Sequence, residues 1–144
     1  MANEEHYAIL KQGVRFWNEW KLDHSKVKTY FMQADLKGEN LRGVDLSGAN
    51  LSGADLSDAN LTNADLSNVD LSFAYLLSTN FGGADLSGAD LRDANLSNLS
   101  QEGPNLSIQY PNGANLRGAK VTLEQLAESR SLQGAIMPDW SKHP

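Results

Sequence analysis

Hydrophobic residues recur at every fifth position over most of the chain. Of the eighteen consecutive slots from Phe31 to Leu116, all except Gln101 and Pro111 hold Leu or Phe. A helix would repeat its apolar residues every three or four positions, and a half-buried strand every two, so neither element fits this period. A longer fixed period is typical of a solenoid, in which each coil packs only on its neighbours.

The four remaining positions of each five-residue unit are also patterned. Ala or Val stands two residues before twelve of the seventeen slots from Leu36 to Leu116, and we expect these small side chains to face inward. Asp or Asn mostly precedes the Leu and Ser mostly follows it, which places both outside. Two residues after the Leu, Gly, Asn or Asp fills fourteen of the seventeen positions from Gly38 to Gly118. These types tolerate a positive φ, so a left-handed turn is predicted in every unit.

The segments that flank the repeat predict helices. Residues 4 to 22 predict one amphipathic helix that Gly13 weakens slightly, and its apolar side consists of Tyr7, Ile9, Leu10, Val14, Phe16, Trp17 and Trp20. We expect residues 1 to 30 to cap the open end of the first coil, since terminal coils expose core and backbone. The alternative is a helix that binds a partner. Thr122 and Gln125 form a capping-box pattern, which predicts a second capping helix over 123 to 131 within residues 121 to 144.

Tandem units such as Ala49-Asn50-Leu51-Ser52-Gly53 resemble the A(D/N)LXX units of the pentapeptide-repeat family. The resemblance covers residues 31 to 120. It implies an all-β solenoid, a right-handed quadrilateral β-helix with four pentads per coil. Eighteen pentads would then give about 4.5 coils, stacked over about 22 Å at the spacing of paired strands. The flanking segments, including Asn18 between two tryptophans, are similar to those of bacterial and especially cyanobacterial members.

Composition narrows the class of protein further. One continuous repeat in 144 residues indicates a single domain. No apolar run approaches the roughly 20 residues of a membrane span, and the first residues lack signal-peptide features, so we expect a cytoplasmic protein without membrane association. The net charge is −6, and residues 31 to 120 carry eleven acidic and five basic side chains. This acidic repeat disfavours direct binding to nucleic acid. With both ends capped, we expect a monomer.

The residues give no support for catalysis, for a cofactor or for a metal site. The chain has no cysteine, and His6, His24 and His143 lie outside the repeat without metal-like spacing. We therefore expect a protein that is not an enzyme. Segment 98 to 113 keeps the five-residue register but contains Pro104 and Pro111, and we expect the coil to bulge there.

One turn departs from the polar exterior of the repeat. Phe73, Tyr75 and Leu77 occupy outward positions that elsewhere hold Gly or Asn, Asp, and Ser. Three apolar side chains would then project from the middle of the solenoid, as at a protein interface. Equally, the N-terminal segment or segment 98 to 113 would cover them.

The acidic residues form a second candidate surface. With four pentads per coil, Asp45, Asp65 and Asp85 stack on one side, and Asp70 and Asp90 are adjacent on the next. The resemblance implies two functions, since some cyanobacterial members are regulatory binding proteins and certain others present acidic coils to a type II topoisomerase in place of DNA. We favour a noncatalytic scaffold that binds an unidentified protein partner. Acidic mimicry is the alternative, weakened by the shortness of the coil and by its arginines.

Overall fold

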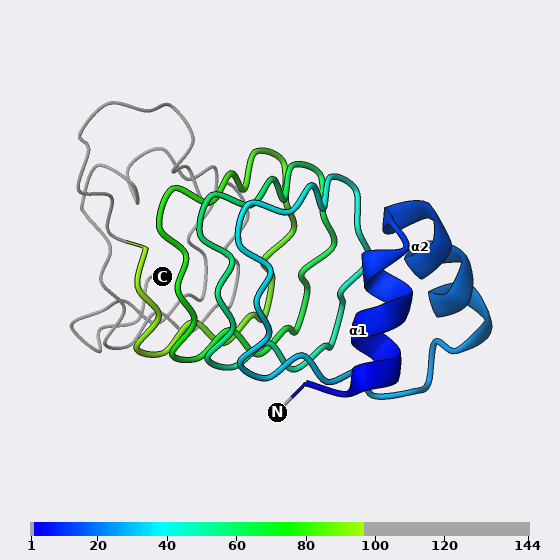
Figure 1. The fold of residues 1–144 in the computed structure, drawn as a ribbon. Helices are drawn as coiled ribbons and strands as arrows, with labels where there is room; N and C mark the ends of the chain where they lie inside the picture. Colours follow the sequence, from blue (N-terminus) through cyan, green and yellow to red (C-terminus); the bar gives the residue numbers. More distant parts are fainter. Residues whose placement is uncertain (1, 97–144) are drawn as a thin grey trace.

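The computed structural model describes residues 2 to 96, in which two helices precede a stack of coils (Figure 1). Helix α1 spans Glu4–Lys11 and helix α2 spans Val14–Asp23. Parallel bridges join the residue before each Leu or Phe position to the residue twenty positions later, from the pair of Tyr30 and Asn50 to the pair of Tyr75 and Asn95. Twenty residues are four pentads, so the prediction of four pentads per coil is confirmed. Within the described residues, the coils are connected by single β-bridges, and no strand of several residues is formed. The predicted helix over 123 to 131 and the segment 98 to 113 lie outside the described residues.

The core is a column of Leu side chains lined by small residues. Every Leu or Phe slot from Phe31 to Leu96 is at most 3% exposed, and the Ala and Val positions beside them are equally buried, with Ala34 the most exposed at 5%. The predicted inward positions are therefore confirmed over this range. Glu39 replaces Ala in the first coil and forms an ion pair with Lys11 of α1. Thr79 replaces Ala in the third and donates from its hydroxyl to the carbonyl of Leu56 at 2.8 Å.

The predicted left-handed turns are present in every described unit. All positions two residues after a Leu or Phe slot, from Gln33 to Asp93, have φ between 56° and 72°. Each turn is closed by a backbone bond such as that from the N–H of Ala49 to the carbonyl of Leu46, at 3.0 Å. A positive φ at the third residue of a four-residue turn is the type II pattern, for which Gly and Asn are preferred. These turns bend the chain at each corner of the coil.

The prediction of one helix over residues 4 to 22 is wrong, because Gly13 separates two helices. Gly13 has φ 121° and ψ 160°, a conformation that residues with a Cβ rarely adopt, and it precedes the first residue of α2. The change of direction alters which side chains face the coil. Trp17 is completely buried, whereas Phe16, expected on the apolar side, is 57% exposed.

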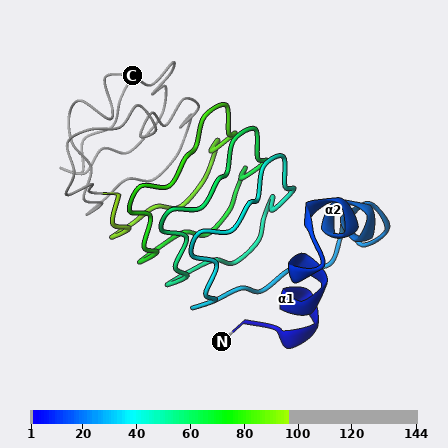
Figure 2. The ribbon, with the colours of Figure 1, turned by 45° about the horizontal axis from the view of Figure 1, so that its top comes forward.

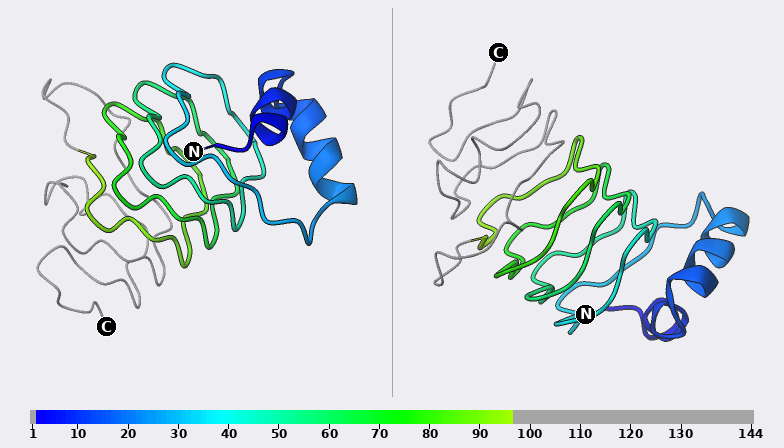
Figure 3. Two further views of the ribbon diagram at one scale, coloured as in Figure 1. Left: turned by 60° about the horizontal axis from the view of Figure 1, so that its bottom comes forward. Right: turned by 90° about the horizontal axis from the view of Figure 1, so that it is seen from above.

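The two helices pack on the open end of the first coil (Figures 2 and 3). Their side chains bond backbone groups that point away from the second coil. The indole Nε1 of Trp17 donates to the carbonyl of Asp45 at 2.6 Å, and the phenol of Tyr7 donates to the carbonyl of Asp35 at 3.0 Å. Asn18 makes two bonds of 2.9 Å, accepting from the N–H of Asp45 and donating to the carbonyl of Gly43.

Aromatic rings continue the Leu column into the helices. The ring of Trp17 lies 5.2 Å from that of Phe31, the first residue of the repeat, and 5.1 Å from that of Trp20. His6 is buried beside them, and its Nδ1 accepts from the N–H of Tyr30 at 3.2 Å. Burial lowers the pKa of His6, although the charge of Glu5 partly opposes this shift. The described residues contain no helix long and apolar enough to cross a membrane.

Candidate interaction surface

Phe73, Tyr75 and Leu77, which together we call the aromatic patch, lie on the outside of the third coil. Phe73 is 63% exposed and Tyr75 is 53% exposed, whereas Leu77 is partly buried. Phe73 and Tyr75 flank the buried Ala74 and therefore project from the same stretch of coil. The N-terminal helices pack at the end of the stack (Figure 1). The exposed fractions of the two rings show that the helices do not cover them.

Phe73 stands at a turn position where a large side chain is unfavourable. Its φ is 59°, in the left-handed region. That conformation costs a residue with a Cβ about 1 to 2 kcal/mol. Burial of a ring would offset such a cost, but this ring is mostly in solvent. The turn immediately before it in the stack, twenty residues earlier, is Gly53, which takes the same φ without a side chain.

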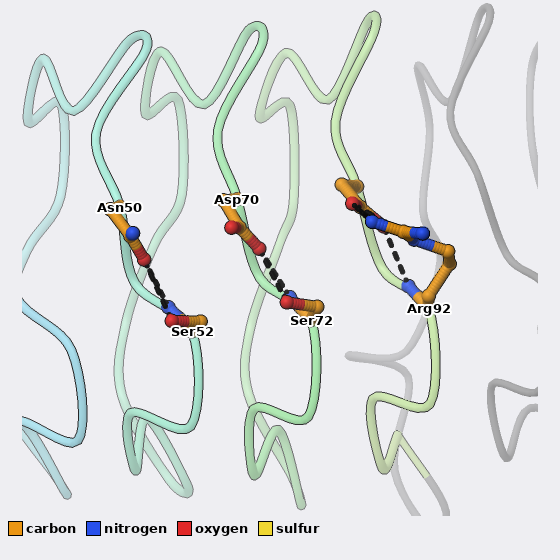
Figure 4. Close-up of polar contacts among 6 residues, drawn as sticks. Asn50, Ser52, Asp70, Ser72 and Arg92 are labelled. Carbon is orange, nitrogen blue, oxygen red and sulfur yellow. Dashed lines mark hydrogen bonds and ion pairs between the residues drawn. The ribbon is translucent and has the colours of Figure 1, made fainter.

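Tyr75 replaces a side-chain acceptor that the fold uses at the other positions of this type from Asp35 to Asp90. There, an Asp or Asn Oδ1 accepts from the backbone N–H two residues later, at 2.9 to 3.3 Å. Figure 4 shows this bond in successive coils, donated by Ser52 to Asn50 and by Ser72 to Asp70, and Arg92 of the next coil donates the same bond to Asp90. This local turn bond explains the preference for Asp or Asn before Leu. Tyr75 cannot supply it, so the patch departs from the rules of the fold at two neighbouring positions.

The acidic face contains the predicted stack of Asp45, Asp65 and Asp85, which the bridges place directly one above another. Asp70 and Asp90 are paired in the same way on the adjoining side. Each carboxylate also accepts a turn bond; the Oδ1 of Asp65, for example, is 3.0 Å from the backbone N of Ser67 and 2.6 Å from its hydroxyl.

Asn performs the same local role in a neighbouring column, where Asn40, Asn60 and Asn80 accept the corresponding bonds. The turn bond therefore requires a carbonyl-type oxygen and does not require a charge. Asp on one side and Asn on the next therefore serve the fold equally well, but only Asp adds a negative charge. The charge of the acidic face is not needed for the turn bonds.

The guanidinium of Arg92 is hydrogen-bonded to Asp90 on this acidic side. Its Nε lies 2.9 Å and 3.0 Å from the two carboxylate oxygens of Asp90, and its Nη2 lies 2.6 Å from one of them. Hydrogen bonding and charge attraction from Asp90, with smaller contributions from Asp70 and Asp93, raise the pKa of Arg92 above its ordinary value. The guanidinium is thus bonded to Asp90, on the side of the coil that also carries Asp70.

Three other features of the described residues bear on possible metal or ligand sites. No group of His and acidic residues between positions 2 and 96 has the arrangement of a metal site. An open pocket lies where α1 meets the first coil, beside Tyr7, Met32 and Asp35, but the Tyr7 hydroxyl there is bonded to backbone. His24, the residue that follows α2, stacks on Trp20 with the ring centres 4.3 Å apart.

The sequence reading missed the acidic residues beside the aromatic patch. Asp55 is bridged to Tyr75 in the preceding coil, and the twenty-residue register places Asp93 after Phe73 in the stack. Asp58 lies near Leu77, because its N–H donates to the Leu77 carbonyl at 2.9 Å. Adding or subtracting twenty from each patch residue identifies Asp55 and Asp93 from sequence alone.

Comparison with known proteins places this fold in a family. The model of pentapeptide repeats matches eight copies over residues 28–63 and 64–98. The chain belongs to the pentapeptide-repeat family, and solved members of the family imply that the four-sided coil is a right-handed quadrilateral β-helix.

Three solved structures illustrate the relationship. HetL, a protein of the cyanobacterium Nostoc sp. strain PCC 7120 involved in the regulation of heterocyst differentiation, is 36% identical, with 80% of this chain and 49% of HetL covered and a TM-score of 0.55. A thylakoid-lumen protein of Arabidopsis thaliana is 29% identical, with 67% and 64% covered and a TM-score of 0.58. Rfr23 of Cyanothece 51142 is 32% identical, with 76% and 58% covered and a TM-score of 0.45. This chain thus spans about half to two thirds of these relatives. A search of curated proteins finds no match.

Proposed function

We propose that this chain is a noncatalytic scaffold that binds another protein through the aromatic patch, and that this binding is regulatory. The observation that supports the proposal is Phe73, a large side chain with φ 59° and 63% of its surface exposed. The ring adds strain and little burial to the isolated protein. Strained residues that the fold does not require are typical of functional sites.

The composition of the patch supports a protein partner. Aromatic residues are enriched at the centres of protein interfaces, and Tyr contributes both apolar area and a polar hydroxyl. The rigidity of a stacked coil also favours binding, because little conformational freedom is lost at the interface. The regulatory role rests on the similarity to HetL, which is described as taking part in the regulation of differentiation.

Capture on immobilised protein tests the proposal. We would compare the wild type with Phe73→Gly, in which the turn is retained and the ring is removed, and with Phe16→Ala, which removes an exposed ring from α2. A protein retained by the wild type and by Phe16→Ala, and lost with Phe73→Gly, is the expected result. If all three retain the same proteins, the patch is not the binding surface and the proposal fails.

The stacked carboxylates favour a second candidate, an acidic DNA mimic that binds a type II topoisomerase. Its test is inhibition of DNA supercoiling by gyrase with the wild type and with Asp45, Asp65 and Asp85 all replaced by Asn. The substitution keeps the acceptors of the turn bonds and removes three charges, as in the neighbouring Asn column. Inhibition by the wild type that is lost in the triple variant would favour mimicry over the scaffold.

A further inference from the structure

The aromatic patch is bordered by carboxylates in the coils before and after it. Asp55 is bridged to Tyr75, and adjacent coils are separated by about 4.8 Å, so the carboxylate is one coil from the phenol ring. Asp93 follows Phe73 in the same corner column, and Asp58 lies next to Leu77 through its backbone bond. Asp58 and Asp93 are exposed.

Within the described residues, no basic side chain forms an ion pair with Asp55, Asp58 or Asp93. Arg92 is adjacent to Asp93 in sequence and is attracted by its charge, but its guanidinium is bonded to Asp90 on the neighbouring side. Lys37 is on the same side as the patch, two coils before Leu77 and one coil before the coil of Asp55 and Asp58, at about 4.8 Å per coil along the stack. Three carboxylates thus border the aromatic patch, with Asp55 and Asp93 adjacent to Tyr75 and Phe73 and Asp58 adjacent to Leu77.

We infer that the aromatic patch binds an arginine-bearing segment of the partner, with a guanidinium lying against Tyr75 or Phe73 and bonded to Asp55 or Asp93. This inference rests on the proposed function, since it specifies the partner of the same surface. A cation over an aromatic ring is attracted by the negative face of the ring, and nearby carboxylates strengthen that attraction. Arginine is favoured over lysine because its planar group stacks on rings and donates two parallel bonds to a carboxylate.

The same charges exclude other occupants. An acidic peptide would meet three like charges, and the phosphates of a nucleic acid or of an anionic membrane would be repelled in the same way. A purely apolar segment would cover the rings, but it would move the partly buried carboxylate of Asp55 further from water, with only the turn bond from the N–H of Ser57 to stabilise its charge. An arginine satisfies both the rings and the carboxylates.

Selection from a random peptide library displayed on phage tests the inference without knowledge of the partner. The full chain serves as bait, and Phe73→Gly serves as the counter-selection, because Gly is the residue found at the same turn one coil earlier. We expect the selected peptides to be enriched in arginine and to lose affinity at least tenfold on Phe73→Gly. Replacing Asp55 by Asn, which keeps its turn acceptor, should weaken binding about threefold, and raising salt should weaken it further.

The outcomes separate this inference from the proposed function. Peptides that depend on Phe73 but lack basic residues, or that bind equally well after Asp55→Asn and in high salt, would overturn the arginine assignment and leave the scaffold in place. Absence of any Phe73-dependent peptide would overturn the inference that a linear segment binds here. Capture on Phe73→Gly would still decide whether the patch binds a folded partner. A matched set of Lys-for-Arg peptides that binds equally well would refute the preference for the planar group.

Discussion

Asn18 provides a sharp test of how the helices stabilise the coil. Its amide bonds both the carbonyl of Gly43 and the N–H of Asp45 at 2.9 Å, and it lies partly buried between α2 and the first coil. Replacing Asn18 by Ala removes both bonds at once. Each is worth about 0.5 to 1.5 kcal/mol in net stability, so the expected loss is about 1 to 3 kcal/mol.

A matched control is available on the same helix. Glu19 is the next residue, its side chain is 60% exposed, and its ion pair is with Arg15 on the solvent side. Glu19→Ala should change stability by less than about 0.5 kcal/mol. Ala is also a better helix former than Asn, which would stabilise the Asn18 variant by up to about 0.7 kcal/mol, so any loss observed understates the two hydrogen bonds.

Equilibrium unfolding in urea, followed by far-ultraviolet circular dichroism and by tryptophan fluorescence, measures the difference. Fluorescence reports on Trp17 and Trp20 at the junction together with Trp140. Circular dichroism reports on the whole chain. Coincident transitions shifted to lower urea in Asn18→Ala, and not in Glu19→Ala, would support our proposal that residues 1 to 30 are a cap of the solenoid. Equal stability of the two variants would show that these bonds do not hold the helices to the coil.

Three further predictions concern single positions. Leu66→Asp buries a charge in the Leu column and should lower the free energy of unfolding by more than about 4 kcal/mol or prevent folding. The control Ser67→Asp should change the melting temperature little. Equal melting temperatures of the two variants would reject the assigned inward and outward positions. Phe73→Gly should leave the free energy of unfolding unchanged or raise it by up to about 1 kcal/mol, because Gly accepts the left-handed turn. If urea titration shows a clear decrease in the free energy of unfolding, the ring contributes to the stability of the fold. Burial lowers the pKa of His6 in the folded protein from 6.5, so the unfolded chain takes up a proton first as the pH falls. The free energy of unfolding should therefore be constant above about pH 6.5 and decline below it until the folded pKa is passed. Thermal melts of His6→Gln across this pH range should lack that decline.

The repeat was predictable because each of its positions obeys a local rule. Leu or Phe at one position, with Ala or Val two residues before it, fills the narrow apolar interior of the coil. Gly48 and Asn63 mark left-handed turns through their own backbone preferences. Such rules act within a few residues, so the sequence displays them directly. The four-pentad coil, by contrast, was implied by the resemblance to a family, and the period of five alone does not determine it.

The junction of helices and coil could not be predicted to the same detail. Asn18 bonds residues 25 and 27 positions away, and no local pattern announces those partners. The position of Phe16 depends on the angle at Gly13, whose φ of 121° redirects the chain. An apolar wheel drawn through residues 4 to 22 assumes one straight helix and therefore assigns Phe16 to the wrong side.

A uniform repeat cannot specify where a partner binds, because each coil presents nearly the same polar surface. Information about location must come from departures, and a departure in a solenoid has consequences in fixed directions. Residues twenty positions before and after share its column, so Tyr75 acquires Asp55 and Asn95 as neighbours through the geometry of the coil. Evolution of such a surface requires only single outward substitutions, since the Leu column beneath is unaffected. The aromatic patch fits this logic: Ala74 and Leu76 remain buried like the corresponding residues of most described pentads, while Phe73 and Tyr75 exchange local turn stability for a distinct surface.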